Sequence, residues 1–444
     1  MLSNATRIAL LRRRATALAD EIRVWDAAAT SDKAYSIHRS QIFALKEMMS
    51  VLFERQRALL TALSPAAPFD SFAADVGAIE REIVGANDLW RTFRTALDQR
   101  RDAAPRAALD AADLTAADCY LGSMRRAAAW KIVDEDRFRE PPLTLLDARY
   151  TPATAPRATP VSAAGLATRV YKDMRLPVPL LLLPFDQIGG MWHLTAIHHE
   201  VGHDLDQDLG LRGGLAEALG RALGAASVPD ARRAVWGGWV PELLGDAVGV
   251  LLGGAGFGAS LASLLAALGA GRQIAALDDP HPDSTLRVAL LAALLRAASP
   301  ALATAADAIL TDYGPLTKPA GIEPYVPDLP AVAAALLDTK LAGLSGHALR
   351  ELGDDLAADD ALARQIAAFL SGTGQRPNLL QTPARLVAPA AYLAIDALDD
   401  ANDAALTMIH QRALQLIQSI PRPQFLSGAS RRAFLRELVQ QITF

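Results

Sequence analysis

Apolar residues recur at helical spacing along most of the chain. Over residues 3–105, Ala, Leu, Arg and Glu dominate, and apolar positions return about every three or four residues, which is typical of amphipathic helices. The stretch 64–71 (SPAAPFDS) interrupts this pattern with two prolines. The N-terminal part is therefore predicted to be a helical hairpin or a three-helix bundle that acts as a scaffold.

Shorter apolar runs bounded by prolines follow a further helical segment at 114–132. Residues 143–150 (LTLLDARY) could form a short strand, and residues 178–183 predict a second one. Because Pro179 cannot donate a hydrogen bond, we expect the second segment to be an edge strand. A helix is expected over about 191–206.

Helical patterns then dominate to the end of the chain, and a proline-rich break lies at 318–330. Before this break, helices are expected at 242–252, 260–268, 285–298 and 301–311. The fold class predicted from the pattern is mainly α, with a small sheet and helical regions at both ends. The predicted domains are an N-terminal helical bundle (1–110), a central domain (111–320) and a C-terminal helical region (321–444).

Charge and cysteine content exclude some function classes. The 444 residues include 44 basic and 49 acidic ones, with a net charge of −5, and no basic run marks a nucleic-acid surface. Cys119 is the only cysteine, which fits a reducing compartment. The N-terminus does not match a signal peptide, so we expect a cytoplasmic protein that does not bind nucleic acid.

Residues 247–270 carry no charge and are long enough to cross a bilayer. Ala, Gly and Ser dominate this segment, however, and large apolar side chains are few. This composition favours a buried, partly broken helix, and membrane association stays open as the less favoured alternative.

Candidate chemistry is concentrated in residues 193–211 (HLTAIHHEVGHDLDQDLGL). His199 and His203 are four residues apart, so on a helix both project from one face and can bind a single zinc ion. Glu200 lies about 100° further round the helix, where it can reach a water molecule without being a ligand. HEVGH thus matches the HExxH motif, in which the glutamate is a general base.

The neighbouring polar residues do not share that geometry. His193 and His198 point away from the ligand face and are expected to be hydrogen-bonded helix residues. Asp204, Asp206 and Asp208 follow the motif, and we expect them to form a solvated helix end.

A third ligand must come from outside the motif. The metzincin pattern is excluded, because Asp206 and Leu209 stand where it requires glycine and histidine. Glu242 is the best alternative, since it would complete a His₂Glu site and leave one position for water. Asp246, one helical turn later, could accept the outer N–H of a ligating histidine. Asp206 and Glu217 remain open as rival ligands.

The order HExxH, then E-x-x-x-D, then HP-x-x-x-x-R resembles the gluzincin metallopeptidases. The last motif begins at His281 and ends at Arg287. The similarity is greatest to the branch that contains CAAX prenyl endopeptidases and heat-shock-associated membrane proteases, and it covers about residues 176–295. The convincing transmembrane helices of that branch are missing here, so membrane residence and lipidated substrates are not carried over.

The resemblance implies a gluzincin-like α+β catalytic core in the central domain. It implies zinc ligation by His199, His203 and Glu242, with Glu200 as base. It also implies a supporting role for Asp246, and it places His281 and Arg287 near the active site.

The expected activity is zinc-dependent hydrolysis of a peptide bond in a peptide or protein substrate. Glu200 would take a proton from water and pass it to the leaving amine. His281 is the first candidate for stabilising the oxyanion, with Tyr313 or Tyr325 as alternatives. Residues 178–183 could pair with an extended substrate as an edge strand.

Two other functions stay open. The chain could be a helical scaffold with a silent or structural zinc site, although such a site has no need of a base at Glu200. It could also be a zinc hydrolase that cleaves a non-peptide amide. The sequence does not determine the oligomeric state.

Overall fold

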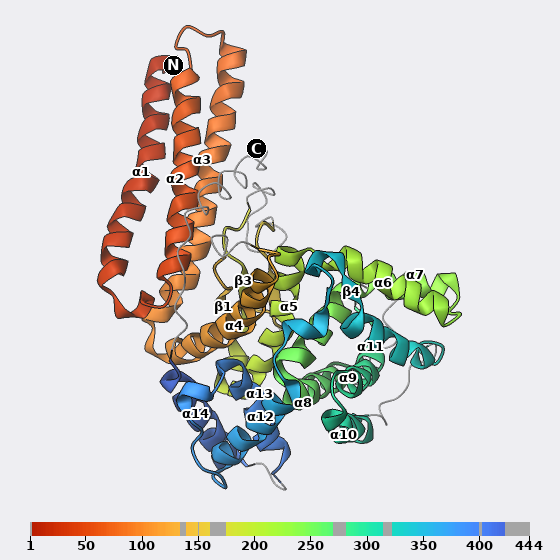
Figure 1. The fold of residues 1–444 in the computed structure, drawn as a ribbon. Helices are drawn as coiled ribbons and strands as arrows, with labels where there is room; N and C mark the ends of the chain where they lie inside the picture. Colours follow the sequence, from red (N-terminus) through yellow and green to blue (C-terminus); the bar gives the residue numbers. More distant parts are fainter. Residues whose placement is uncertain are drawn as a thin grey trace.

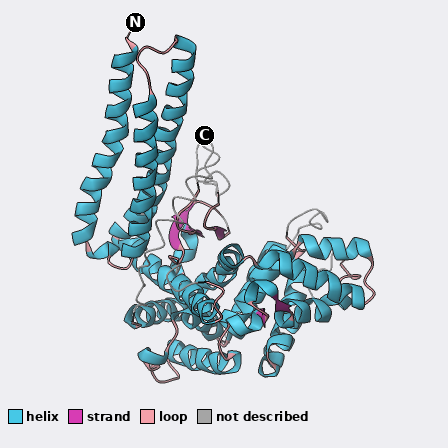
Figure 2. Cartoon of the chain, turned by 45° about the horizontal axis from the view of Figure 1, so that its top comes forward, coloured by secondary structure: helices cyan, strands magenta, loops and turns pink. Residues whose placement is uncertain are grey.

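The protein is mainly helical, with two small β-sheets, as the sequence pattern predicts (Figures 1 and 2). The computed structural model describes residues 2–133, 139–149, 151–159, 175–269, 281–313, 322–398 and 402–421. The predicted domain boundaries remain predictions.

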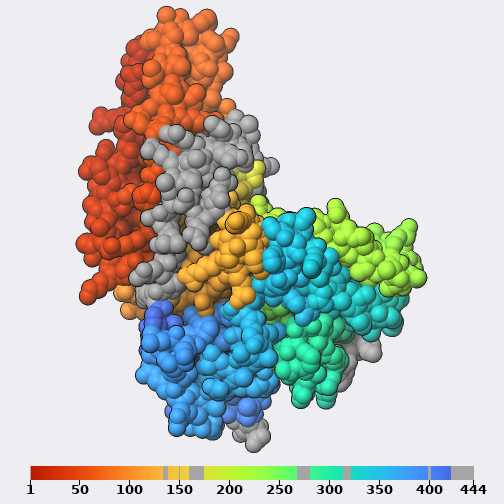
Figure 3. Space-filling model, viewed as in Figure 1, coloured from red at the N-terminus to blue at the C-terminus, as the bar shows by residue number. Residues whose placement is uncertain are grey.

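Three long helices form the N-terminal bundle. They are α1 (Asn4–Ser31), α2 (Arg39–Ala62) and α3 (Phe69–Asp98). Their buried apolar faces pack against one another, and the predicted break at 64–71 lies between α2 and the first turn of α3. The bundle extends well beyond the rest of the molecule (Figures 1 and 3). Of the two predicted alternatives, the three-helix bundle is the one observed.

A three-stranded sheet follows α4 (Ala103–Ala129). Its strands are β1 (Leu143–Asp147), β2 (Ala153–Ala155) and β3 (Leu180–Pro184), in the order β1-β3-β2. β1 pairs with β3 in parallel, so that Leu143 lies opposite Leu180. β2 pairs with β3 in antiparallel orientation, with Thr154 opposite Leu181.

The prediction that residues 178–183 form an edge strand is wrong, because β3 is the central strand. Pro179 immediately precedes β3, so its missing N–H removes no bond from the ladder. Its carbonyl oxygen instead accepts a hydrogen bond from the N–H of Leu143 at 2.9 Å. β2 is an edge strand of the described sheet.

The next helices hold the HExxH motif and its surroundings. The 3₁₀ helices η4 (Phe185–Gly189) and η5 (Met191–Thr195) lead into α5 (Ala196–Leu209), which ends at Gly210 with φ of 66°. The helix expected from residue 191 thus begins with a 3₁₀ turn. Three helices follow: α6 (Leu211–Ala225), α7 (Asp230–Gly238) and α8 (Val240–Gly269).

Helix α8 lies in the centre of the main body, with α5, α9, α12 and α13 packed around it. It bends at Gly254, whose φ of 57° and ψ of −144° are not helical. Its glycines allow close packing: a Cβ on Gly256 would lie 2.5 Å from the carbonyl oxygen of Pro389. By length and composition the segment Val240–Ala267 could cross a membrane, but 72% of its most apolar window is buried in the protein. These features favour the predicted buried, broken helix.

The remaining elements complete the main body. They are α9 (Ser284–Ala298), α10 (Ala303–Tyr313), α11 (Leu329–Asp338), α12 (Leu356–Ser371), α13 (Val387–Asp396), α14 (Asp403–Ser419) and the pair β4 (Lys340–Leu341) and β5 (His347–Ala348). Apolar residues from α4, α5, α8 and the C-terminal helices share one core, so the C-terminal region packs directly on the helices that carry the motif.

Candidate metal centre

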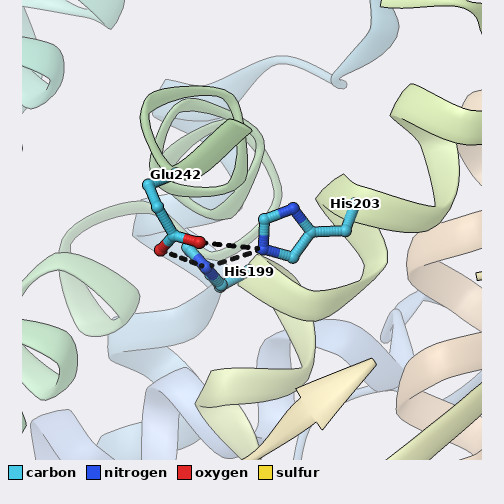
Figure 4. Close-up of side chains that lie close together, drawn as sticks. All are labelled: His199, His203 and Glu242. Atoms are coloured by element: carbon cyan, nitrogen blue, oxygen red, sulfur yellow. Dashed lines mark hydrogen bonds and ion pairs between the residues drawn. The ribbon is translucent and has the colours of Figure 1, made fainter. Parts of the chain in front are cut away.

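Two helices bring together three side chains that could hold a metal ion. His199 and His203 lie one turn apart on α5, and Glu242 lies in the first turn of α8. Their ligand atoms all lie within 4.8 Å of one another. Figure 4 shows both imidazoles turned toward the Glu242 carboxylate.

The separations within this group fit a metal ion. The Nε2 atoms of His199 and His203 are 3.1 Å apart, and they lie 3.4 and 3.6 Å from the nearer oxygens of Glu242. Ligands about 2.05 Å from a tetrahedral zinc ion are separated by about 3.3 Å. Two imidazole nitrogens and one carboxylate form one of the donor sets found in catalytic zinc sites, so the residues present are compatible with the metal that the sequence predicted.

Two glycines let the helices approach closely enough for this group to form. A Cβ on Gly202 would lie 2.9 Å from the Cα of Gly245, so α5 and α8 are in backbone contact here. A Cβ on Gly245 would lie 2.6 Å from the His199 ring. A side chain at Gly202 would therefore force the backbones of the two helices to shift, and one at Gly245 would displace the His199 ring.

Asp246 and Arg287 form a second layer behind the ligands. The Nδ1 of His199 lies 2.9 Å from Oδ1 of Asp246, which leaves Nε2 facing the centre of the group. Arg287 donates to both oxygens of Asp246 at 2.6 and 3.0 Å, and it lies 3.3 Å from Glu242. This arrangement fixes the orientation of the His199 ring.

The electrostatics of the group favour a cation at its centre. Burial disfavours the charged form of His199, but hydrogen bonds to Asp246 and Glu242 outweigh burial and raise its pKa to about 10. Burial and the neighbouring His199 lower the pKa of His203 to about 4. Burial opposes ionisation of Glu242, yet its contacts with His199 hold its pKa well below the usual range. A proton on His199 thus occupies the position where a metal cation would be favoured.

Glu200 is buried beside the ligands, on the face of α5 that meets β2. Burial raises the pKa of its carboxyl to about 7, while a hydrogen bond from the Thr154 backbone and the charges of His199 and Arg287 act in the opposite direction. A carboxyl with this pKa can both accept and release a proton near neutral pH.

The three candidates for oxyanion stabilisation lie in different places. His281 is just before α9, largely exposed, with its Nε2 3.5 Å from Oε1 of Glu242. The Tyr313 hydroxyl instead lies 3.1 Å from that of Tyr392. Tyr325 packs in an aromatic cluster with Trp236 and Trp239. Of the three, only His281 has a described contact with a ligand residue.

The other two histidines of the motif region face elsewhere. His198 is fully buried, and its ring nitrogens lie 2.9 and 2.8 Å from the carbonyl oxygens of Thr195 and Arg385. His193 is exposed and packs beside Trp192. Neither joins the group of ligands.

The acidic residues after the motif are buried, so the prediction of a solvated helix end is wrong. Asp206 binds the backbone N–H and the guanidinium of Arg212. Asp204 hydrogen-bonds Thr154, and Asp208 pairs with Arg139 and Arg157, so described residues before and after β1 and β2 cover this side of α5. Of the rival third ligands, Asp206 is thus engaged with Arg212, and Glu217 is exposed beside Arg221.

A second group of metal-ligand types lies where the N-terminal bundle meets α4, and consists of His38, Asp110 and Asp113. The buried Arg100 donates to the Nε2 of His38 at 3.0 Å and to both oxygens of Asp113. The Nδ1 of His38 lies 2.8 Å from the side-chain oxygen of Gln41. Since the guanidinium pairs with the Asp113 carboxylate and uses the free lone pair of His38, we assign no metal there.

Comparison with family models, with curated proteins and with solved structures finds no match to this chain. What the structure establishes is therefore a His/His/Glu group that could hold a metal ion, in a mainly helical protein.

Sequence reasoning missed several residues that shape this site, chiefly Thr154, Gly245 and the buried acids. Asp204 and Asp208 follow Glu200 at intervals of four, and this spacing in the sequence indicates that they share its helix face. Gly245 lies between Glu242 and Asp246, where a missing side chain hints at close packing. No local signal pointed to Thr154.

Proposed function

We propose that the protein is a zinc-dependent metallopeptidase. The observation that supports this best is the convergence of His199, His203 and Glu242 with Glu200 buried alongside. A purely structural site would not need the additional carboxyl of Glu200 beside its ligands. The motif order that resembles gluzincins supports the same activity.

In the proposed reaction, His199, His203 and Glu242 hold the ion. Zinc, when bound, supplies a Lewis acid that lowers the pKa of water and polarises the scissile carbonyl. Glu200 accepts the proton of the attacking water and delivers it to the nitrogen of the leaving amine. Asp246 keeps the His199 ring in place, and His281 is proposed to donate to the oxyanion from the exposed side.

The edge strand β2 is a suitable platform for an extended substrate. It lies against α5, and β3 occupies one of its edges while no described strand pairs with the other. A peptide backbone added at that edge would run beside Glu200. The proposed substrate is therefore a peptide or protein. The buried lone Cys119 is in keeping with the proposed cytoplasmic location.

Native mass spectrometry and a peptide-library assay would test this proposal on the full chain. Wild type should carry one zinc ion and cleave peptides. Glu200→Gln should keep the metal and lose cleavage by about 10³-fold or more, and His199→Ala should lose the metal. His193→Ala is the matched control, because this exposed histidine lies outside the ligand group.

The outcomes separate the competing functions. A wild-type protein without stoichiometric zinc would refute the proposal. Zinc binding without any peptide cleavage would favour a scaffold with a silent site or a hydrolase of non-peptide amides.

A further inference from the structure

We infer that Thr154 is a positioning residue, which holds the edge strand β2 against the face of α5 that bears Glu200. The inference rests on the proposed function, because it assumes that substrate aligns along β2. It assigns a role in substrate binding to a side chain that belongs to none of the three motifs.

The basis is a row of three acids on one face of α5. Glu200, Asp204 and Asp208 are four residues apart, so they lie one above another along the helix. All three carboxylates are shielded from solvent, and each faces the segment that contains β2. We call these three residues the acidic row.

The end of the row remote from the metal ligands anchors the flanks of β2. Asp208 accepts hydrogen bonds from Arg139, at 3.0 Å, and from the Tyr120 hydroxyl. It also pairs with the fully buried Arg157, which donates to the carbonyls of Glu140 and Pro177. The chain on both sides of β2 is thereby tied to α5.

Thr154 makes the contacts nearest the ligands. Its Oγ1 donates to Oδ1 of Asp204 at 3.1 Å, and its backbone hydrogen-bonds the Glu200 carboxylate. On the other side it pairs with Leu181 of β3. One residue thus links the central strand, the edge strand and the helix that carries the general base.

The Thr154 hydroxyl matters because β2 is short and paired on one side. Three residues offer few ladder bonds, so the position of the strand depends on its side-chain anchors. The Oδ2 of Asp204 is buried without a hydrogen-bond partner, and the Thr154 hydroxyl is the one hydrogen-bond donor to this carboxylate within the part of the chain that the structure describes. Losing it would leave Asp204 without a hydrogen-bond donor among the described residues and let β2 move before substrate arrives.

The test compares Thr154→Val with Thr154→Ser in the full, zinc-loaded protein. Valine keeps the shape and the backbone N–H but lacks the hydroxyl, and serine restores the hydroxyl. We expect Thr154→Val to raise KM for a peptide substrate about tenfold, with kcat changed by less than about threefold and zinc content unchanged. Thr154→Ser should stay within about threefold of wild type.

Thr115→Val is the matched control. Thr115 is buried in α4 and its hydroxyl donates to the carbonyl of Ala111 in the same helix, so this hydrogen bond involves neither α5 nor β2. This variant loses a buried hydroxyl in the same way and should leave KM and kcat unchanged.

Amide hydrogen exchange of residues 151–159 gives a readout that does not depend on activity. Exchange in this segment should rise at least about tenfold in Thr154→Val and stay near wild type in Thr154→Ser. If wild type cleaves peptides and Thr154→Val has the same KM and the same exchange, the inference is overturned while the proposed function stands. If wild type cleaves nothing, the proposed function fails and the substrate-positioning role fails with it. A rise in exchange would then show only that Thr154 anchors the strand.

Discussion

Adding one methyl group at Gly245 tests whether helix packing sets the metal centre. Gly245 lies in α8 between Glu242 and Asp246, directly under the His199 ring. In Gly245→Ala, the new Cβ would lie 2.6 Å from Cε1 of His199 and 2.7 Å from Nδ1. Carbon atoms pack at about 3.5–4.0 Å, so the imidazole must move by about 1 Å.

This displacement acts mainly on metal binding. A shift of about 1 Å disrupts the 2.9 Å contact between His199 and Asp246 and misaligns Nε2 with the other two ligands. Loss of such outer contacts lowers metal affinity by about 10–100-fold. Crowding costs about 1–3 kcal/mol, and the better helix propensity of alanine returns about 1 kcal/mol, so the metal-free variant should remain folded.

Zinc affinity should be measured by competition with a chromophoric chelator, and stability by urea unfolding of the metal-free protein. Gly213→Ala in α6 is the control, since a Cβ there would meet nothing within 4 Å. It should stabilise the protein by up to about 1 kcal/mol and leave zinc affinity unchanged. A folded Gly245→Ala protein with wild-type zinc affinity would refute the reasoning.

Three further predictions concern residues in and around the candidate metal centre. Asp246→Asn should weaken zinc binding by about 10–100-fold, measured by the same competition, because His199 loses its carboxylate partner; equal affinity would contradict this role. His198→Ala should keep one zinc per chain yet lower the free energy of unfolding by about 1–3 kcal/mol, because the neutral ring donates its one N–H to a buried carbonyl oxygen, of Thr195 or Arg385, which then loses its donor. Burial raises the pKa of Glu200 from 4.5 to about 7, so the folded state binds a proton more tightly than the unfolded state. The metal-free wild type should therefore lose stability, relative to Glu200→Gln, as pH rises from about 4.5 to about 7. Urea unfolding at several pH values checks the sign, and a difference that is constant with pH would contradict it.

Much of the fold could be predicted from the sequence, because helical periodicity depends on residues that are near one another in the chain. The N-terminal helices, the break at 64–71 and the interrupted apolar helix α8 all follow from residues close together in the sequence. The order of the strands in the sheet could not be predicted in this way. Pro179 suggested an edge strand, but whether a strand lies at an edge depends on which segments pair with it, and β1 and β2 both pair with β3.

The same distinction between local and long-range information applies to the candidate site. The sequence alone determined that His199 and His203 share a helix face with Glu200 beside them, because covalent geometry sets the angle between residues one and four apart. It also proposed Glu242, but it left Asp206 and Glu217 open. The Glu242 carboxylate reaches the two imidazoles only because α5 and α8 pack in close contact at Gly202 and Gly245.

Burial was likewise decided by tertiary structure. From the sequence, Asp204 and Asp208 were predicted to be solvated, since acidic side chains at a helix end are usually exposed. In the folded chain, the segment that contains Thr154 and Arg157 covers them, and the hydroxyl and guanidinium supply hydrogen bonds in place of water. Periodicity determined which residues share a face of α5, and long-range packing determined what that face meets.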